Sequence, residues 1–379
     1  MNQKQLGLYI HIPFCKQKCY YCDFSSYPGM EKYWGDYTEA LVSELIAKAE
    51  EYDNPFLNTI FIGGGTPSLI PSEYISRILE TVHRYYKVSK DCECTIESNP
   101  GTLTDDKLKN YKDFCINRLS IGLQACQNEL LKKLGRIHTY DDFLYALKLS
   151  QKHGFDNINA DIIFGIPNQT LSQWIDTVSK VISFGLTHIS CYSMQIEDDT
   201  EFGRLKQSGQ LEEIEDELDR SMYHYAVDAF DKAGFPQYEI SNFSKPHFKC
   251  RHNMNYWERG EYLGAGAGAH SFVHSRRFAN TAGVMEYIEG IKENKPVLSE
   301  DNYLSMDDGI KESIILGLRL NEGVDFTKLS KQYGLDLMSL YQKVLNKLLS
   351  LNLVESKGAV IKLTRKGMDL ANKVFVEFI

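Results

Sequence analysis

Short apolar segments rich in β-branched residues recur through the first half of the chain, and stretches with helical periodicity separate them. Strands that alternate with helices of this length form parallel β/α units in one sheet. Six units are too few to close an eight-stranded barrel, so the pattern predicts an α/β fold with an open, partial (β/α)6 barrel of the TIM type. The six predicted strands are Leu8–Pro13, Thr59–Gly64, Cys94–Ser98, Arg118–Gln124, Asn159–Gly165 and His188–Ile196.

Signals for helix ends support this alternation. Two pairs of residues have the spacing of a capping box, in which a Thr and a polar residue three positions later cap a helix start: Thr139 with Asp142, and Thr170 with Gln173. Gly154 and Gly185 follow where these two helices should stop, because glycine tolerates the left-handed backbone of a helix end. In parallel sheets of this kind, ligands bind at the carboxyl ends of the strands.

The second half of the chain has a different pattern. Gln210–Gly234 predicts one long amphipathic helix, Gln237–Phe278 is less regular, and the polar stretch Lys292–Asp301 predicts a linker. Residues 304–379 then predict helices, an alternating segment at Ala359–Leu363 and a last helix, which is the order of a small winged-helix-like domain. Such domains bind DNA or pack against a partner, and the acidic chain favours the second role.

Composition narrows the classes of function. The formal net charge of −9 argues against a nucleic-acid partner, because phosphate binding needs clustered Lys and Arg. No apolar run approaches the roughly 18 residues of a membrane span, and Met1–Gly7 lacks the apolar core of a signal peptide, so we expect a cytoplasmic protein. The nine cysteines are an odd number in a chain without secreted character, which argues against a disulfide framework.

Three of the cysteines, Cys15, Cys19 and Cys22, lie together just after the first predicted strand. Structural zinc sites use four ligands, usually as two separated pairs, and Cys92 and Cys94 are too close together to form a second pair. Three thiolates without a fourth suit a 4Fe–4S cluster with one iron left open, which the amino and carboxylate groups of S-adenosylmethionine (SAM) can chelate. The alternative is three reduced thiols in a loop.

Polar residues at the ends of the following strands indicate a binding pocket. The glycine-rich run Gly63–Ser68 ends the second strand, where glycines let the backbone approach a ligand, although such loops also simply turn the chain. Glu97 and Asp161 are carboxylates in otherwise apolar strands, and a buried acid needs a partner. Ribose hydroxyls or a cationic cofactor would serve, and so would a structural salt bridge.

The cysteine motif and the Tyr-Ile-His-Ile-Pro-Phe run before it, residues 9–14, resemble the radical SAM superfamily. The likeness runs from about Leu8 to the C-terminus, and it is greatest to the branch of oxygen-independent coproporphyrinogen III oxidases (HemN) and haem chaperones (HemW). It implies a radical SAM core at residues 1–235, an extension with a haem motif and linker at 236–300, and a HemN-type C-terminal domain at 301–379.

The resemblance also implies cofactors and the residues that hold them. It implies a 4Fe–4S cluster on Cys15, Cys19 and Cys22. The positions that match SAM contacts in the family are Tyr9, Tyr21, Gly64, Gly65, Thr66, Glu97, Gln124, Arg136 and Asp161. For Arg136, a solvated arginine at a helix end is the alternative.

Two departures set the chain apart from the oxidases. They have a further Cys two residues after the third, where this chain has Phe24, and they have a substantial segment before the cluster, where this chain has 14 residues before Cys15. The haem chaperones show Asp-Phe after the third Cys, which matches Asp23 and Phe24. The resemblance is therefore closest to the haem chaperones.

A second motif indicates haem. The run Arg-His-Asn-Met-Asn-Tyr-Trp at 251–257 resembles a His-Asn-x-x-Tyr-Trp motif associated with haem binding in the chaperones. The resemblance implies contacts to haem from His252, Asn253, Tyr256 and Trp257, with His252 as the axial ligand, because a neutral imidazole binds haem iron well. The alternative is that this run caps a turn and packs in the core.

A glycine-rich run, Gly264–Ser271, follows this motif and predicts a second close approach of backbone to ligand. His270 within it is either a second candidate ligand of haem iron or a hydrogen-bonded core histidine.

The favoured function is therefore a haem chaperone. It would bind haem as cargo and deliver it to acceptor haemoproteins, which in the family are respiratory proteins at the membrane, with peripheral membrane location through partners and a homodimer as further expectations. The alternatives are an oxygen-independent coproporphyrinogen III oxidase, which carries out a radical SAM oxidative decarboxylation, and a radical enzyme that acts on nucleic acid.

Overall fold

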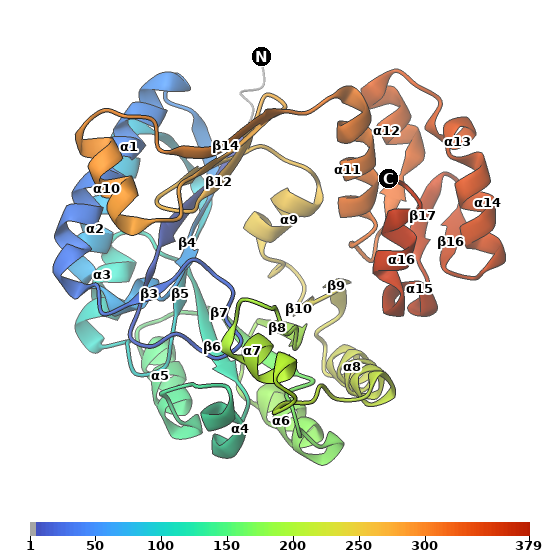
Figure 1. Cartoon of the computed structure of the whole chain (residues 1–379), viewed down its shortest axis with the longest axis horizontal. Coiled ribbons are helices and arrows are strands. Elements are labelled where there is room, and N and C mark those ends of the chain that lie inside the picture. Colours follow the sequence, from blue (N-terminus) through green and yellow to red (C-terminus); the bar gives the residue numbers. More distant parts are fainter. Residues whose placement is uncertain (1–4) are drawn as a thin grey trace.

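The computed structural model describes residues 5–379, and its main feature is one mixed sheet of 12 strands. The middle of this sheet consists of strands that pair in parallel in the order β1-β4-β5-β6-β7-β8 (Figure 1). The sheet does not close, so the predicted open, partial barrel is confirmed. These strands are β1 (Gln5–Ile12), β4 (Phe56–Gly64), β5 (Lys87–Ser98), β6 (Arg118–Gln124), β7 (Asn157–Phe164) and β8 (His188–Ser193).

Helices that connect these strands lie along the outer side of the sheet (Figure 1). Both predicted capping boxes are present, at Thr139 and at Thr170. Gly154 and Gly185 follow the ends of those helices with φ of +74° and +71°, as predicted. The helices are α1 (Trp34–Glu51), α2 (Ser72–Tyr85), α3 (Asp105–Asp113), α4 (Asn128–Lys133), α5 (Tyr140–Lys152) and α6 (Leu171–Ser183).

The prediction of one helix over Gln210–Gly234 was wrong at its start. Helix α7 (Glu201–Gln207) comes first, and α8 (Asp216–Lys232) begins only after an irregular segment. Gly209 has φ of +70° and ends the first helical stretch. Asp216 and Glu217 then start α8, because acidic side chains are favourable at a helix N-terminus.

The segment after α8 extends both edges of the sheet. Strand β10 pairs antiparallel with β8, and β11 pairs in parallel with β1 and continues into an antiparallel run of β12, β13 and β14. The elements are β9 (Gln237–Glu239), β10 (Asn242–Ser244), α9 (Arg251–Trp257), β11 (Tyr262–Ala265), β12 (His270–Val273), β13 (Arg276–Asn280), α10 (Val284–Lys292) and β14 (Leu298–Tyr303).

The prediction of a linker at Lys292–Asp301 was also wrong over its second part, because from Leu298 onward the chain forms β14, which pairs with β13. Every side chain of β14 is exposed, so the strand has no apolar face that the hydrophobic pattern could show. Its order comes from the ladder and from charge, for example the ion pair between Arg276 and Asp301 at 2.7 Å.

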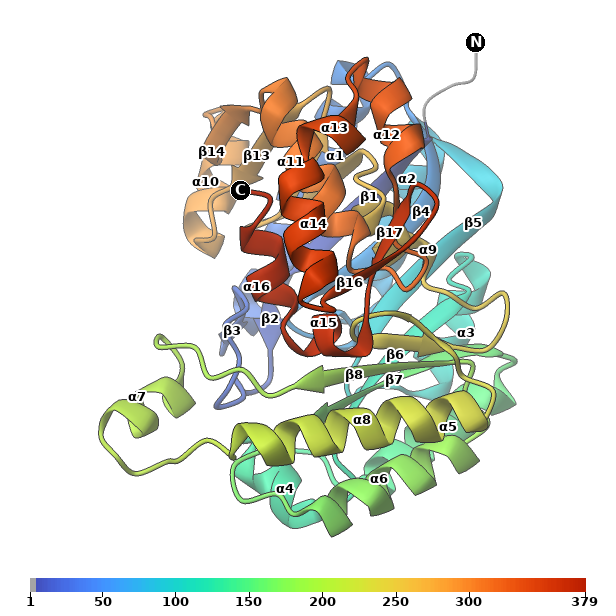
Figure 2. The same ribbon diagram turned by 90° about the vertical axis from the view of Figure 1, so that its right-hand side faces the viewer.

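The last part of the chain has its own apolar core, with Ile314, Phe326 and Leu337 fully buried. Helices come first and a small antiparallel sheet follows, which is the predicted winged-helix-like order (Figure 2). The elements are α11 (Met306–Gly317), β15 (Val324–Asp325), α12 (Phe326–Tyr333), α13 (Leu337–Leu340), α14 (Gln342–Ser350), β16 (Val354–Lys357), β17 (Val360–Leu363), α15 (Arg365–Asp369) and α16 (Ala371–Val376). Within residues 5–379, no helix is both long and apolar enough to cross a membrane.

Candidate functional site

The three clustered cysteines lie on a loop that leaves the carboxyl end of β1. Two short strands, β2 (Phe14–Cys15) and β3 (Tyr27–Pro28), pair with each other and close the base of this loop. The backbone amide of Tyr20 donates to the Leu134 carbonyl at 3.1 Å, which ties the middle of the loop to the core. All three cysteines are half-buried and none forms a disulfide.

The cysteine loop covers a cavity of about 460 Å³ at the carboxyl ends of the parallel strands. The cavity is lined by Cys15, Cys19 and Cys22 and, of the residues predicted to contact SAM, by Tyr21, Gly64, Gly65, Thr66, Glu97, Gln124, Arg136 and Asp161. Tyr9 lies instead in an adjoining cavity, where its hydroxyl bonds His11 Nδ1 at 3.0 Å. Residues from four strands, from the cysteine loop and from two further loops therefore meet, although they are far apart in the sequence.

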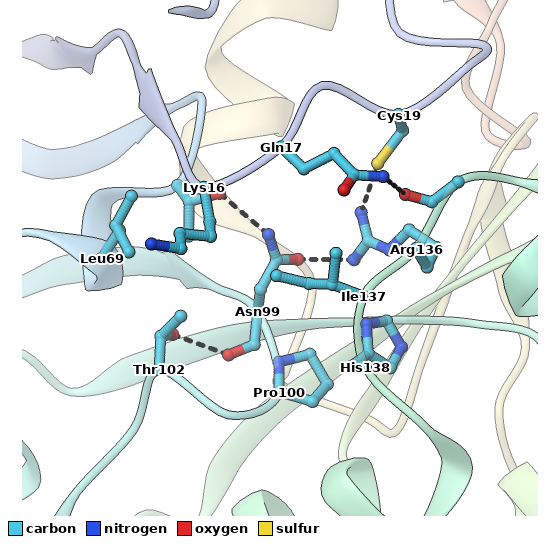
Figure 3. Close-up of a pocket in the computed structure, with 12 residues that line it drawn as sticks. Lys16, Gln17, Cys19, Leu69, Asn99, Pro100, Thr102, Arg136, Ile137 and His138 are labelled. Atoms are coloured by element: carbon cyan, nitrogen blue, oxygen red, sulfur yellow. Dashed lines mark hydrogen bonds between the residues drawn. The ribbon is translucent and has the colours of Figure 1, made fainter. Parts of the chain in front are cut away.

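A chain of hydrogen bonds joins Cys15 to Cys19 across the edge of this cavity, and Figure 3 shows its part from Asn99 through Arg136 to Cys19. Cys15 Sγ lies 3.5 Å from Thr66 Oγ1, which accepts from Asn99 Nδ2 at 2.8 Å. The Asn99 side-chain oxygen accepts from Arg136 Nη2, and Arg136 Nη1 donates to Cys19 Sγ at 3.4 Å. Arg136 therefore points into the site, and the alternative of a solvated helix-end arginine does not hold.

Two glycines allow close approach at the cavity wall. Gly64 has φ of +113°, and a Cβ there would lie 2.5 Å from the His11 ring. A Cβ on Gly122 would lie 2.8 Å from Arg136 Nη2 and 2.8 Å from Gln124 Nε2. Any side chain at either position would fill space that the polar groups of the site occupy.

Two carboxylates face the cavity from β5 and β7. Glu97 accepts a hydrogen bond from the Gly64 amide at 3.1 Å, and burial, with a smaller contribution from Asp161, raises its pKa to about 8. Burial also raises the pKa of Asp161, although Ser120 and Asn159 donate to it at 3.0 and 2.9 Å. A cationic or hydroxyl-bearing ligand would therefore stabilise the charged forms of both acids.

Gln124 ends β6 with a strained backbone. Its φ is +67°, in the left-handed region that favours glycine, and the pairing of β6 with β7 shifts register between Gly122 and Gln124. A bulge of this kind re-aims a side chain next to a binding site. Such strain costs of order 1–3 kcal/mol and persists where the surrounding structure holds it.

The donor set of this cavity fits a 4Fe–4S cluster. Within the described residues, no three His, Cys, Asp or Glu side chains converge tightly enough to hold one metal ion. A cubane needs a different arrangement, because each thiolate binds a different iron atom. Burial raises the pKa of the Cys15 and Cys22 thiols, so the positive charge of iron would be needed to hold them as thiolates.

The haem motif forms helix α9, and His252 is buried in it. His252 Nδ1 lies 2.9 Å from Thr59 Oγ1, and Nε2 lies 2.9 Å from Tyr256 Oη. Its backbone amide donates to Glu93 Oε1 at 3.1 Å. Burial lowers the pKa of His252 to about 3. Iron could bind this imidazole only if one of the two ring contacts breaks.

The other residues of the motif are placed differently. Tyr256 lines two neighbouring cavities of about 360 and 300 Å³, and Trp257 lines the second of them. Arg319 lies over the Trp257 ring, 4.4 Å from its centroid. Asn253 is half-buried one turn before Trp257 and lines none of these cavities. The motif therefore contributes aromatic surface to the cavities but no open imidazole.

Sequence reasoning missed two residues of the site. Asn99 bridges Thr66 and Arg136, and Gly122 leaves room for Arg136. Both lie at the carboxyl ends of predicted strands, which was the signal that could have found them.

Comparisons with known proteins agree with this site and fold. Residues 9–181 match the radical SAM superfamily model, and residues 304–370 match the HemN C-terminal domain model. The chain is 36% identical over 372 residues to the haem chaperone HemW of Bacillus subtilis strain 168, with 98% of each chain covered. It is 35% identical to HemW of Lactococcus lactis strain IL1403, with 100% of this chain and 98% of the relative covered.

A solved structure shares the fold. The coproporphyrinogen III oxidase HemN of Escherichia coli, described as a radical SAM enzyme, superposes with a TM-score of 0.88 at 22% identity, covering 99% of this chain and 90% of that one. At this identity the likeness concerns the fold alone. The identities with the chaperones extend over the full length of both chains, and on that basis this protein belongs to the HemW haem-chaperone family of the radical SAM superfamily.

Proposed function

We propose that this protein is a haem chaperone that holds a 4Fe–4S cluster and SAM and delivers haem to acceptor haemoproteins. The observation that carries the proposal is the full-length identity of 36% to a haem chaperone, with 98% of both chains covered. An identity that extends over the core, α9 and the C-terminal domain covers every part of the chain that such a function would use.

The residues around the large cavity would hold the cofactors. Cys15, Cys19 and Cys22 would ligate the cluster. When bound, the reduced cluster supplies one electron that can cleave a sulfonium S–C bond of SAM. Arg136 would meet the SAM carboxylate, because a guanidinium pairs with a carboxylate through two parallel hydrogen bonds. Glu97 and Asp161 would accept from ribose hydroxyls, while the glycine loop would bring backbone amides close to the ligand.

Phe24 argues for the chaperone over the oxidase. It stands where the oxidases of the branch have a further Cys, and its side chain is 64% exposed at the mouth of the cavity. An exposed phenylalanine offers apolar surface to a flat cargo and no thiol to a cluster. An anaerobic assay with reductant, SAM and coproporphyrinogen should therefore yield no protoporphyrinogen, and its formation would support the oxidase instead.

The proposal includes the partners of haem transfer. The acceptors would be haemoproteins of the respiratory chain, so the protein would meet them at the membrane surface without spanning the membrane. A homodimer and a cytoplasmic location belong to the same proposal. Binding of nucleic acid is not expected from a chain with a net charge of −9.

Haem titration tests the proposed function directly. Purified protein, with its cluster reconstituted anaerobically, should give a saturable shift of the Soret band when ferric haem is added. The haem-loaded protein should then transfer its haem to an apo-haemoprotein faster than the apo-haemoprotein takes up free haem from detergent. Absence of a saturable shift would reject the chaperone function. A shift no larger than the one that an unrelated protein gives in the same buffer would also reject it.

A further inference from the structure

Three cavities adjoin one another in series. The cysteine cavity shares Asp23, Phe24, Gly64 and Glu97 with the cavity of about 360 Å³. That second cavity shares Tyr256 and Tyr262 with the third, of about 300 Å³. A flat, largely apolar ligand bound in the second cavity would therefore lie beside the proposed SAM site and could extend into the third cavity.

Two histidines line the second cavity, and only one has an open imidazole. His11 Nδ1 is bonded by the Tyr9 hydroxyl at 3.0 Å, and its Nε2 meets the Ser25 carbonyl at 2.9 Å. His270 is exposed to the cavity, and its ring has no hydrogen bond or ion pair within residues 5–379. His252 lies next to this cavity behind Tyr256, with both ring nitrogens engaged.

The strand pairing leaves space around His270. It begins β12, lies opposite Ala279 of β13, and its carbonyl passes against Gly264 of β11, where a Cβ would lie 2.1 Å from it. Residues directly opposite each other on paired strands share one face of a sheet. The row across the strands therefore carries a hydrogen and a methyl group on either side of the His270 imidazole, which keeps the ring accessible.

The next row of the same face carries aromatic and cationic groups. Phe272 pairs with Tyr262 on one side and with Arg277 on the other, and all three line the third cavity. Arg277 and Arg259 both pair with one acid, Glu312, at 2.6 and 3.0 Å. The single carboxylate balances only one of these two positive charges. A carboxylate of an apolar ligand would be attracted to this end.

We propose that His270 supplies the iron ligand for haem, with the porphyrin lying along Tyr256 and Tyr262 and a propionate directed to Arg277. The inference rests on the proposed function, since it assigns the site of the same cargo. A neutral imidazole nitrogen is a good axial ligand of haem iron, and His270 offers one without the loss of any contact. His252 then has a structural role, in which it holds Tyr256 in place against the porphyrin.

Ferric haem titrations of the wild type and of four variants test this assignment. His270→Ala should weaken haem binding at least tenfold and change the Soret maximum, and added free imidazole should restore the wild-type spectrum. His270→Met should instead give the spectrum of a thioether-ligated haem, which a merely structural role for His270 could not produce. His274→Asn is the matched control, since His274 is an exposed histidine in the turn after β12 and Asn tolerates its φ of +51°.

The outcomes separate this inference from the proposed function. If wild-type protein shows no saturable Soret shift, both are rejected. If wild-type protein binds haem and His270→Ala and His270→Met keep its affinity and spectrum, the assignment of His270 is rejected and the chaperone function stands. His252→Asn, checked for folding by circular dichroism, should keep the wild-type ligation spectrum. Loss of that spectrum in a folded variant would identify His252 as the iron ligand instead of His270.

Discussion

The cysteine cavity and helix α9 carry the two motifs of this chain, and the structure places their polar groups in opposite ways. Around the cysteine cavity, groups such as Glu97 and Arg136 come from separate strands and face a common space. In α9, His252 comes from a seven-residue helix and faces the core, with both ring nitrogens bonded to protein atoms. The groups of the first region line a space that can hold a ligand, whereas the imidazole of the second faces other protein atoms.

The partners of a buried polar side chain therefore decide whether its motif indicates a ligand. Charged side chains that converge from several elements on one cavity indicate a ligand, because each acid there has a pKa raised by burial and a bound partner would stabilise its charged form. A histidine whose partners are Thr59 and Tyr256 needs no ligand to explain its burial. Packing within the protein therefore explains the burial of His252 in the motif at 251–257, whereas it does not explain why the polar cavity residues gather at one site.

The largest effect is expected from removal of the cysteine ligands. Changing Cys15, Cys19 and Cys22 together to alanine should abolish cluster binding, because no other cysteine lines the cavity. Iron and acid-labile sulfide per chain, measured after anaerobic reconstitution, should fall to the background of the assay. Cys115→Asn is the control, since Cys115 is exposed outside the cavity with φ of +64°. A triple variant that keeps the brown chromophore would contradict the assignment.

The counterpart in α9 is a loss of stability. His252→Ala should lower the free energy of unfolding by about 2–4 kcal/mol, because it leaves a buried gap and takes the partners of Thr59 and Tyr256 away. Denaturant unfolding measures this. His83→Ala, at an exposed site on α2, should change the same quantity by no more than about 0.5 kcal/mol. Equal effects of the two substitutions would show that the His252 contacts carry no stability.

The same histidine predicts a dependence of stability on pH. Its pKa is about 3 in the folded chain and 6.5 when unfolded, so the unfolded state binds more protons below 6.5. Its contribution is therefore complete above pH 6.5 and is lost as pH falls toward 3, with a slope of at most about 1.4 kcal/mol per pH unit. The pKa of Glu97, raised to about 8, acts in the opposite direction, since its protonated form is favoured by folding between pH 4.5 and 8.

Variants isolate the histidine from the acid. The unfolding free energy of His252→Asn should decline less steeply than that of the wild type between pH 6.5 and pH 4.5. Glu97→Gln should remove the opposing dependence above pH 4.5. Parallel curves for wild type and His252→Asn would mean that other groups, such as His138 with its pKa lowered to about 4, control the dependence.

The hydrophobic pattern was sufficient to predict the parallel half of the fold. All six strands, and the helix starts at Thr139 and Thr170, follow from periodicity and from local capping, which depend on residues a few positions apart. The same information failed for β14, whose residues are all exposed and which is ordered by pairing with β13. A strand without an apolar face has no signal of its own in the sequence.

The cavity was predictable to a similar degree. Strand ends and the cysteine spacing identified where Cys15, Glu97 and Asp161 would meet, because the carboxyl ends of parallel strands share one edge. The bridge through Asn99 and the engaged ring of His252 were not predictable, since both depend on which distant side chains come within hydrogen-bond distance. Such pairings are decided by the packing of whole elements.

Gly122 at the cavity wall tests whether SAM binds beside β6. Gly122→Ala should weaken SAM binding about tenfold, because the new Cβ would lie 2.8 Å from Arg136 Nη2 and push the guanidinium toward the ligand space. Calorimetry on cluster-loaded protein under anaerobic conditions measures the affinity. Gly35→Ala, where the Cβ would lie 3.5 Å from the Tyr74 hydroxyl, is the control and should keep wild-type affinity. Unchanged affinity in Gly122→Ala would place SAM away from β6.

The smallest effect is expected at the bridge between the cysteines. Asn99→Ala removes the contacts that hold Thr66 and the Arg136 guanidinium, yet it leaves both of those side chains in place beside the cysteines. The cluster should then still form, but Arg136 Nη1 should lose its fixed donation to Cys19, so iron should pass to a chelator a few-fold faster. Asn110→Ala, which also breaks one side-chain hydrogen bond, of 2.8 Å to Ser76, lies outside the cavity and should leave that rate unchanged. If both variants release iron at the wild-type rate, the hydrogen-bond chain serves the fold of the loop and does not protect the cluster.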